Sequence, residues 1–163
     1  MGVAGGIGAF TRAPILGQYR VTADNKEIIM DNTILTPALA LITWTLIIWA
    51  WMYALRIPAM QAANIDPQDA AHPGALNVLP MNVRSVADNY NHLHEQPTIF
   101  YALVFYSALA GNGGSTLITL AWIYVALRVV HSLIQCTVNK VMLRFSTFAL
   151  ASLVLVAMTV VNL

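Results

Sequence analysis

The sequence predicts an all-α integral membrane protein: a bundle of four transmembrane helices in up-down-up-down order, preceded by an N-terminal extension that does not span the membrane. Of the 163 residues, 58% are hydrophobic and only 9% are charged, whereas a soluble domain carries about 25% charged residues to solvate its surface. The chain also holds four long, mostly apolar stretches, each near the roughly 20 residues that cross a bilayer. The charge deficit excludes a soluble domain and a disordered chain.

The basic residues are few and scattered. Lys and Arg together number 8 and the formal net charge is +1, whereas nucleic-acid-binding proteins need a clustered basic surface. The single cysteine, Cys136, lies in an apolar stretch, so no disulfide can form within the chain. We therefore expect membrane lipids around the protein and no nucleic-acid partner.

The predicted membrane domain covers residues 32–163, with spans at about 34–55, 86–110, 115–137 and 143–163. The first span has no charge and carries Trp and Tyr in its second half, as is typical of the headgroup region. Arg56 and Pro58 are expected to end it. Residues 57–82 are rich in proline and are predicted to form a loop at the aqueous face, either functional or a passive connector.

Residues 1–31 mix basic and acidic side chains and are too polar to cross a bilayer. They are expected either to lie on the membrane surface or a partner, or to form a partly ordered tail. The turn at residues 111–114 has no Lys or Arg, whereas the other two connections carry Arg56, Arg84, Lys140 and Arg144. Because positive charge is retained in the cytoplasm, both termini are predicted on the non-cytoplasmic side.

Polar side chains inside the second and third spans form the candidate site. A charge deep in a bilayer is costly and normally faces the interior of the bundle. Spacings of three and four residues place side chains of each span on one face of its helix, so that the two faces can meet. The predicted cluster comprises Arg84, Asn91, His92, Glu95, Arg128, His131 and Gln135.

Glu95 is the one carboxylate well inside a span, and Arg128 lies near the middle of the third span. We expect these two side chains to form an ion pair across the helices. The cluster either has a ligand-binding or catalytic role, or only fixes the packing of the bundle. No metal site is expected, because His92 and His94 point to different helix faces and no HxxxH or HExxH spacing occurs.

Three segments together resemble the MAPEG family, the membrane-associated proteins in eicosanoid and glutathione metabolism. They are NYNHLHEQPTIFYAL in the second predicted span, ALRVVHSL in the third and LRFSTFAL at the start of the fourth. The resemblance covers about residues 34–163 and implies a homotrimer with active sites between protomers, toward the cytoplasmic side. By position, Glu95 matches the family's second-helix glutamate, Arg128 and His131 match its Arg-x-x-His pair, and Arg144 matches its fourth-helix arginine.

Several positions depart from the pattern of the glutathione-using relatives. Those relatives carry arginines one and two turns before the glutamate, where this chain has Asn91 and Asp88. They carry an asparagine in place of His92, and active members carry tyrosines in place of Gln135 and Phe148. Since an aspartate repels the carboxylates of glutathione, the chain resembles a divergent, bacterial-type member of the family.

The resemblance implies a protein of the bacterial inner membrane with glutathione transferase or peroxidase activity on lipophilic substrates. Glutathione would be the cofactor, and Arg144 would be the catalytic residue that stabilises its thiolate. Glu95, Arg128 and His131 would organise the pocket rather than react. The alternative is a non-catalytic accessory or structural subunit, which would dock onto a larger membrane complex through residues 1–31 and 57–82.

Overall fold

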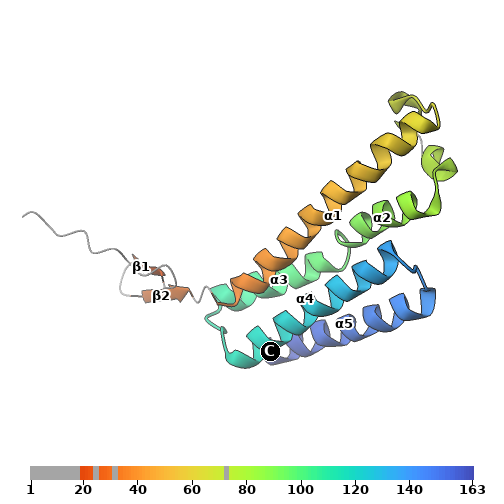
Figure 1. Cartoon of the computed structure of the whole chain (residues 1–163). Coiled ribbons are helices and arrows are strands. Elements are labelled where there is room, and N and C mark those ends of the chain that lie inside the picture. The colour runs from red at the N-terminus through yellow and green to blue at the C-terminus, as the bar shows by residue number, and fades with distance from the viewer. Residues whose placement is uncertain (1–18, 24–25, 31–32, 72–73) are drawn as a thin grey trace, which may run out of the picture.

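The computed structural model describes residues 19–23, 26–30, 33–71 and 74–163. From residue 33 onward the described chain consists of helices and the turns between them (Figure 1). This part of the structure agrees with the predicted all-α membrane domain. It differs from the prediction in where the first helix ends and in the continuity of the second span.

The first helix, α1 (Leu35–Ala62), is 28 residues long and continues through Pro58. Pro58 lacks an amide hydrogen, so the carbonyl four residues earlier loses its helical partner. That carbonyl belongs to Ala54, which is exposed and lies near the polar end of the bundle. We infer that water replaces the missing hydrogen bond there, which explains why the proline does not end the helix.

The predicted loop at residues 57–82 therefore contains regular structure. Beyond the end of α1, the described part of this segment forms two short 3-10 helices, η1 (Pro67–Ala71) and η2 (Ala75–Val78). The next helix, α2 (Met81–His92), follows directly after Pro80. Figure 1 shows that η1 and η2 extend beyond the upper end of the bundle.

The predicted second span, 86–110, is two helices rather than one. A break at residues 93–96 separates α2 from α3 (Pro97–Leu109). Pro97 has no amide hydrogen, so it cannot donate the hydrogen bond to the carbonyl of Leu93 that would join the two helices. Its fixed φ angle suits the first position of a new helix, so the same residue separates the two helices and starts the second.

The last two helices, α4 (Ser115–Cys136) and α5 (Val141–Asn162), lie within a few residues of the predicted third and fourth spans. Among the described residues, three helices are long and apolar enough to cross a membrane: α1, α4 and α5. The 13 residues of α3 rise only about 20 Å, less than the hydrocarbon thickness of a bilayer. The chain is therefore an integral membrane protein with three candidate spans in its described part.

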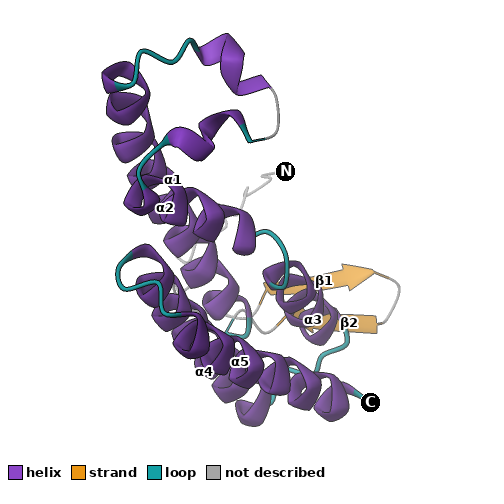
Figure 2. Cartoon of the chain, turned by 90° about the vertical axis from the view of Figure 1, so that its right-hand side faces the viewer, coloured by secondary structure: helices purple, strands orange, loops and turns teal. Residues whose placement is uncertain are grey.

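The helices run alternately up and down. Figure 1 shows that α1 begins at the end of the bundle where α5 finishes, whereas the α1–α2 connection and the α4–α5 turn are both at the other end. Figure 2 views the helices from the end that lies on the right in Figure 1 and shows α4 and α5 next to each other. The core between the helices is apolar and draws on every helix, with buried side chains that include Ile48, Val86, Phe100, Ala121 and Met158.

A two-stranded antiparallel hairpin precedes the helices. Its strands are β1 (Tyr19–Ala23) and β2 (Lys26–Met30), and Figure 1 shows it outside the bundle. The hairpin was not predicted from the sequence, although two β-prone runs separated by two residues are a recognisable hairpin pattern. The rest of the expected extension, residues 1–18, 24–25 and 31, lies outside the described residues.

Candidate functional site

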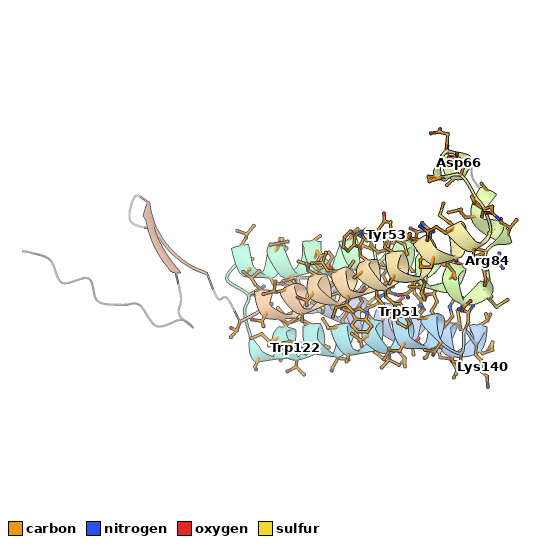
Figure 3. The ribbon with its side chains drawn as sticks, turned by 45° about the horizontal axis from the view of Figure 1, so that its top comes forward. Trp51, Tyr53, Asp66, Arg84, Trp122 and Lys140 are labelled. Carbon is orange, nitrogen blue, oxygen red and sulfur yellow. The ribbon has the colours of Figure 1, made fainter. Side chains whose placement is uncertain are left out.

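Most of the basic residues of the helical part lie at one end of the bundle. Figure 3 shows Arg84 and Lys140 at this end, with Asp66 beyond them and Trp122 toward the opposite end. Arg56 lies in the last two turns of α1, and Arg144 lies in the first turn of α5. The candidate site occupies this end, because its pocket is formed where α2, α4 and α5 meet.

The pocket has a volume of about 230 Å³ and a lining that is part apolar and part basic. α2 contributes His92, α4 contributes His131, and the first turns of α5 contribute the remainder. The ring centroids of His92 and His131 are 5.6 Å apart, and that of Phe148 lies 6.2 Å from His92. The lining residues are His92, His131, Val141, Arg144, Phe145 and Phe148.

His131 joins α4 to the first turns of α5. Its Nδ1 atom lies 3.1 Å from the backbone carbonyl of Arg144 and 3.1 Å from Oγ1 of Thr147. A carbonyl only accepts hydrogen bonds, so in this contact Nδ1 carries the proton. The Nε2 atom of His131 is buried and has no hydrogen-bond partner in the described structure. The imidazole therefore fixes the backbone at Arg144 and keeps one nitrogen free.

Arg144 is half-buried in the wall of the pocket. Its Nη1 atom donates a hydrogen bond to Oδ1 of Asn139, 2.8 Å away, while its Nε is buried without a partner. The guanidinium is thus a cation beside Phe145 and Phe148, with donors left over for an anion. The sequence identified Arg144 and placed Asn139 in the polar turn after the third predicted span, but it did not predict the hydrogen bond between them.

Arg128 is completely buried, as its position near the middle of the third predicted span suggested. Its Nη2 donates a hydrogen bond to the backbone carbonyl of His92 at 2.8 Å, and its Nε and Nη1 have no partner in the described structure. The predicted ion pair with Glu95 is not formed. Glu95 has 63% of its side chain exposed, and its Oε2 lies 3.5 Å from Nδ1 of His92.

The break between α2 and α3 explains this difference. In a continuous helix the carbonyl of His92 would accept a hydrogen bond from the amide of residue 96. Because the helix ends at His92, that carbonyl is free for Arg128. Glu95 lies inside the break, where the helical spacing assumed in the prediction does not hold, and its side chain turns outward.

The other predicted cluster residues occupy three different places. Gln135 is buried and accepts a hydrogen bond from Nδ2 of Asn89 at 3.1 Å, behind the pocket. Asn91 is exposed and Arg84 is half-buried, and neither lines the pocket. Asn89 is fully buried and was missed, although it lies one turn before His92 and therefore on the same helix face.

The family model for the MAPEG family matches residues 34–163. The chain is a member of the MAPEG family. The match covers α1 to α5 and every lining residue of the pocket, and it confirms the resemblance found in the sequence. No curated protein and no solved structure matches the chain. The membrane-embedded character of this MAPEG protein therefore rests on family membership together with its apolar helices.

The lining of this MAPEG pocket offers only some of the groups that a glutathione site would need. Arg144 suits a sulfur anion, and the two phenylalanines suit an apolar co-substrate. The two carboxylates of glutathione find no second Lys or Arg among the residues that line the pocket. Asp88 and Asn91, at the positions where glutathione-using relatives carry arginine, are both exposed on α2.

The described residues contain no group of three or more His, Cys, Asp or Glu side chains arranged to hold a metal ion. His92 and His131 are neighbours in the pocket and Oε2 of Glu95 lies 3.5 Å from Nδ1 of His92, but these three side chains are not arranged as a set of metal ligands. A structural zinc site has four ligands, and a catalytic one has three from the protein.

Proposed function

We propose that this MAPEG protein is a membrane enzyme that conjugates glutathione, through its sulfur, to lipophilic electrophiles or uses glutathione to reduce lipid hydroperoxides. The observation that carries the proposal is the position of Arg144, a cation with free donors in a pocket that is otherwise mostly aromatic and apolar. A cation in such surroundings stabilises a thiolate far better than the same charge in water. The apolar lining suits the hydrophobic second substrate.

In the transfer reaction, the thiol of glutathione gives its proton to water and the resulting thiolate lies beside Arg144. The sulfur attacks an electrophilic carbon, a carbon–sulfur bond forms, and the leaving group departs with its electron pair. With a hydroperoxide, the thiolate attacks oxygen, the oxygen–oxygen bond breaks and the alkoxide takes a proton. A second glutathione then reduces the sulfenic acid, which gives glutathione disulfide and water. Arg128 and His131 organise the pocket and do not react.

The proposal includes an assembly and an orientation. α2 and α3 together make the fourth crossing, the basic end faces the cytoplasm of a bacterial inner membrane, and both termini lie on the other side. Three protomers associate through the apolar faces that one protomer leaves exposed. Support comes from the large exposed side chains of the last two helices, which include Trp122, Val130, Leu150, Leu153 and Val156.

Thermal unfolding of the purified protein with and without glutathione tests the proposal. A ligand present at about 100 times its Kd adds about 2.7 kcal/mol to the free energy of unfolding, which raises Tm by several degrees in a protein of this size. Arg144→Gln is expected to lower the rate of conjugation to a lipophilic electrophile by about 100-fold or more. Lys140→Gln is the matched control, because it removes an exposed cation from the same end of the bundle.

A second candidate is the non-catalytic subunit, and the exposed Asp88 on α2 favours it because an acid there repels the carboxylates of glutathione. η1 and η2, beyond the end of the bundle, would then provide the docking surface. No glutathione-dependent shift in Tm, together with stoichiometric co-purification of a partner, supports this candidate. Loss of that partner on replacing residues 63–79 with a short linker would locate the contact.

A further inference from the structure

We propose that Asn139 is a positioning residue that holds the guanidinium of Arg144 in place and is itself anchored to α2 through Ser85. The inference rests on the proposed role of Arg144 at the thiolate. It assigns a function to the α4–α5 turn, which joins the two helices that supply most of the pocket.

The backbone of the turn restricts the choice of residue at position 139. Asn139 has φ +48°, in the left-handed region, and its amide donates to the carbonyl of Ile134 at 2.7 Å. Glycine and asparagine are the residues that adopt this conformation most readily. The backbone alone would therefore accept glycine, and it does not account for the contacts of the side chain.

The side-chain amide of Asn139 makes two hydrogen bonds with different partners. Its Oδ1 accepts from Nη1 of Arg144 at 2.8 Å, and its Nδ2 donates to Oγ of Ser85 at 3.1 Å. Ser85 is buried on α2, and its hydroxyl donates to the carbonyl of Met81 at 2.8 Å. A continuous series of hydrogen bonds thus connects the backbone of α2 to the guanidinium on α5.

A neutral amide suits this position better than a carboxylate. Aspartate would also accept a hydrogen bond from Arg144, but its negative charge would offset the cation that the thiolate needs. It would also lack the donor that reaches Ser85. Asn139 orients Arg144 and leaves its positive charge free for the substrate.

Arg144 is held at its backbone as well. Nδ1 of His131 lies 3.1 Å from the carbonyl of Arg144, so α4 fixes the main chain while the turn fixes the guanidinium. A cation fixed in advance stabilises a developing charge without reorganising during the reaction. The role of Asn139 is therefore to preorganise the site, without contact to the reacting sulfur.

The test compares Asn139→Gly with Asn64→Gly. Both asparagines have positive φ, +48° and +52°, but Asn64 lies just beyond the end of α1 and outside the pocket lining. The readout is the ultraviolet absorbance of the thiolate of bound glutathione as a function of pH. Asn139→Gly is expected to raise the pH midpoint of this absorbance by about one unit and to lower kcat about tenfold with little change in KM. Asn64→Gly is expected to change neither.

Two further variants keep the interpretation specific to Arg144. In an Arg144→Gln background, Asn139→Gly should cause no additional rise in the midpoint, because residues that act as a unit are not additive. Ser85→Ala should give a smaller rise in the same direction, and it provides the test if Asn139→Gly does not fold. His92 and His131 share the pocket, so each variant is compared with the wild type over the same pH range.

An equal rise in both backgrounds, or a lower Tm with an unchanged midpoint, would overturn the inference. Absence of a thiolate absorbance in the wild type would instead refute the proposed function. The reactivity of Arg144 toward phenylglyoxal, followed by mass spectrometry, then tests whether Asn139 positions Arg144 without the need for bound glutathione. We expect it to rise severalfold in Asn139→Gly, and equal reactivity in the two proteins would contradict the role.

Discussion

The guanidinium of Arg128 lies against the end of α2, where its Nη2 donates a hydrogen bond to the backbone carbonyl of His92 at 2.8 Å. Helix ends leave carbonyls without internal partners, and inside a membrane water is not available to replace them. Arg128 therefore makes the break between α2 and α3 tolerable within the bundle. The hydrogen-bond partner of this completely buried arginine is a backbone carbonyl and not a carboxylate.

Replacing Arg128 with Met is expected to lower the free energy of unfolding by about 1–3 kcal/mol, because the carbonyl of His92 is left buried without a donor. Arg128→Lys keeps a donor and should cost less. Thermal unfolding in detergent measures both variants, with about 2–4 °C expected for each kcal/mol.

The control for this prediction is Glu95→Gln. Since Glu95 is exposed and does not contact Arg128, the cost of Arg128→Met should be the same with Glu95 or Gln at position 95. If the cost of Arg128→Met falls by about 1 kcal/mol or more in the Gln background, the two side chains interact, and the structure, which has no ion pair between them, is contradicted.

The fold could be predicted where hydrophobic runs are uninterrupted. α4 and α5 are apolar along their length and end at polar turns, so their spans were located to within a few residues. Prolines were the source of both differences, because the cost of a proline depends on what surrounds the carbonyl that it leaves unpaired. Pro58, at the polar end, lies within a continuous helix, whereas Pro97 starts a new one.

The candidate site was predicted in part. Helical spacing correctly placed Arg128, His131 and Gln135 on the inner face of α4, where all three are buried. Their partners could not be predicted, because spacing along one helix says nothing of the rotation of its neighbour. Spacing also placed Asn139 in line with Gln135, but its contacts with Arg144 and Ser85 depend on a turn conformation that spacing does not reveal.

The side chains of Asn89 and Gln135 are expected to stabilise the fold as a hydrogen-bonded pair, so that the effects of replacing them are not additive. Both residues are buried, and Nδ2 of Asn89 lies 3.1 Å from Oε1 of Gln135. Replacing Gln135 with Leu leaves a buried donor unpaired and should cost about 1–3 kcal/mol, whereas replacing both residues with Leu should cost less than the sum of the single changes. Thermal unfolding of the four proteins measures this coupling. Simple additivity within about 0.5 kcal/mol would argue against the contact.

A lysine on the outer face of α5 should prevent stable incorporation into the membrane. Leu153 lies near the middle of this helix and is 64% exposed, so its side chain faces lipid or another protomer. A charge at such a position costs about 2.5–3.5 kcal/mol. We expect Leu153→Lys to reduce the amount of folded protein recovered from the membrane fraction severalfold. Val78→Lys is the matched control, because Val78 is exposed in η2 beyond the bundle, and equal loss in both variants would contradict this placement of α5.

Cysteine labelling can determine which end of the bundle faces the cytoplasm. Cys136 is buried and is replaced by Ala to give a background without thiols. Single cysteines are then placed at Val78, near the basic end, and at Asn112, in the turn between α3 and α4; both positions are exposed. Because positive charge is retained in the cytoplasm, a membrane-impermeant maleimide should label Asn112→Cys in intact spheroplasts and Val78→Cys only after permeabilisation. The reverse pattern would place the pocket on the outer side, away from the cytoplasmic glutathione that the proposed reaction uses.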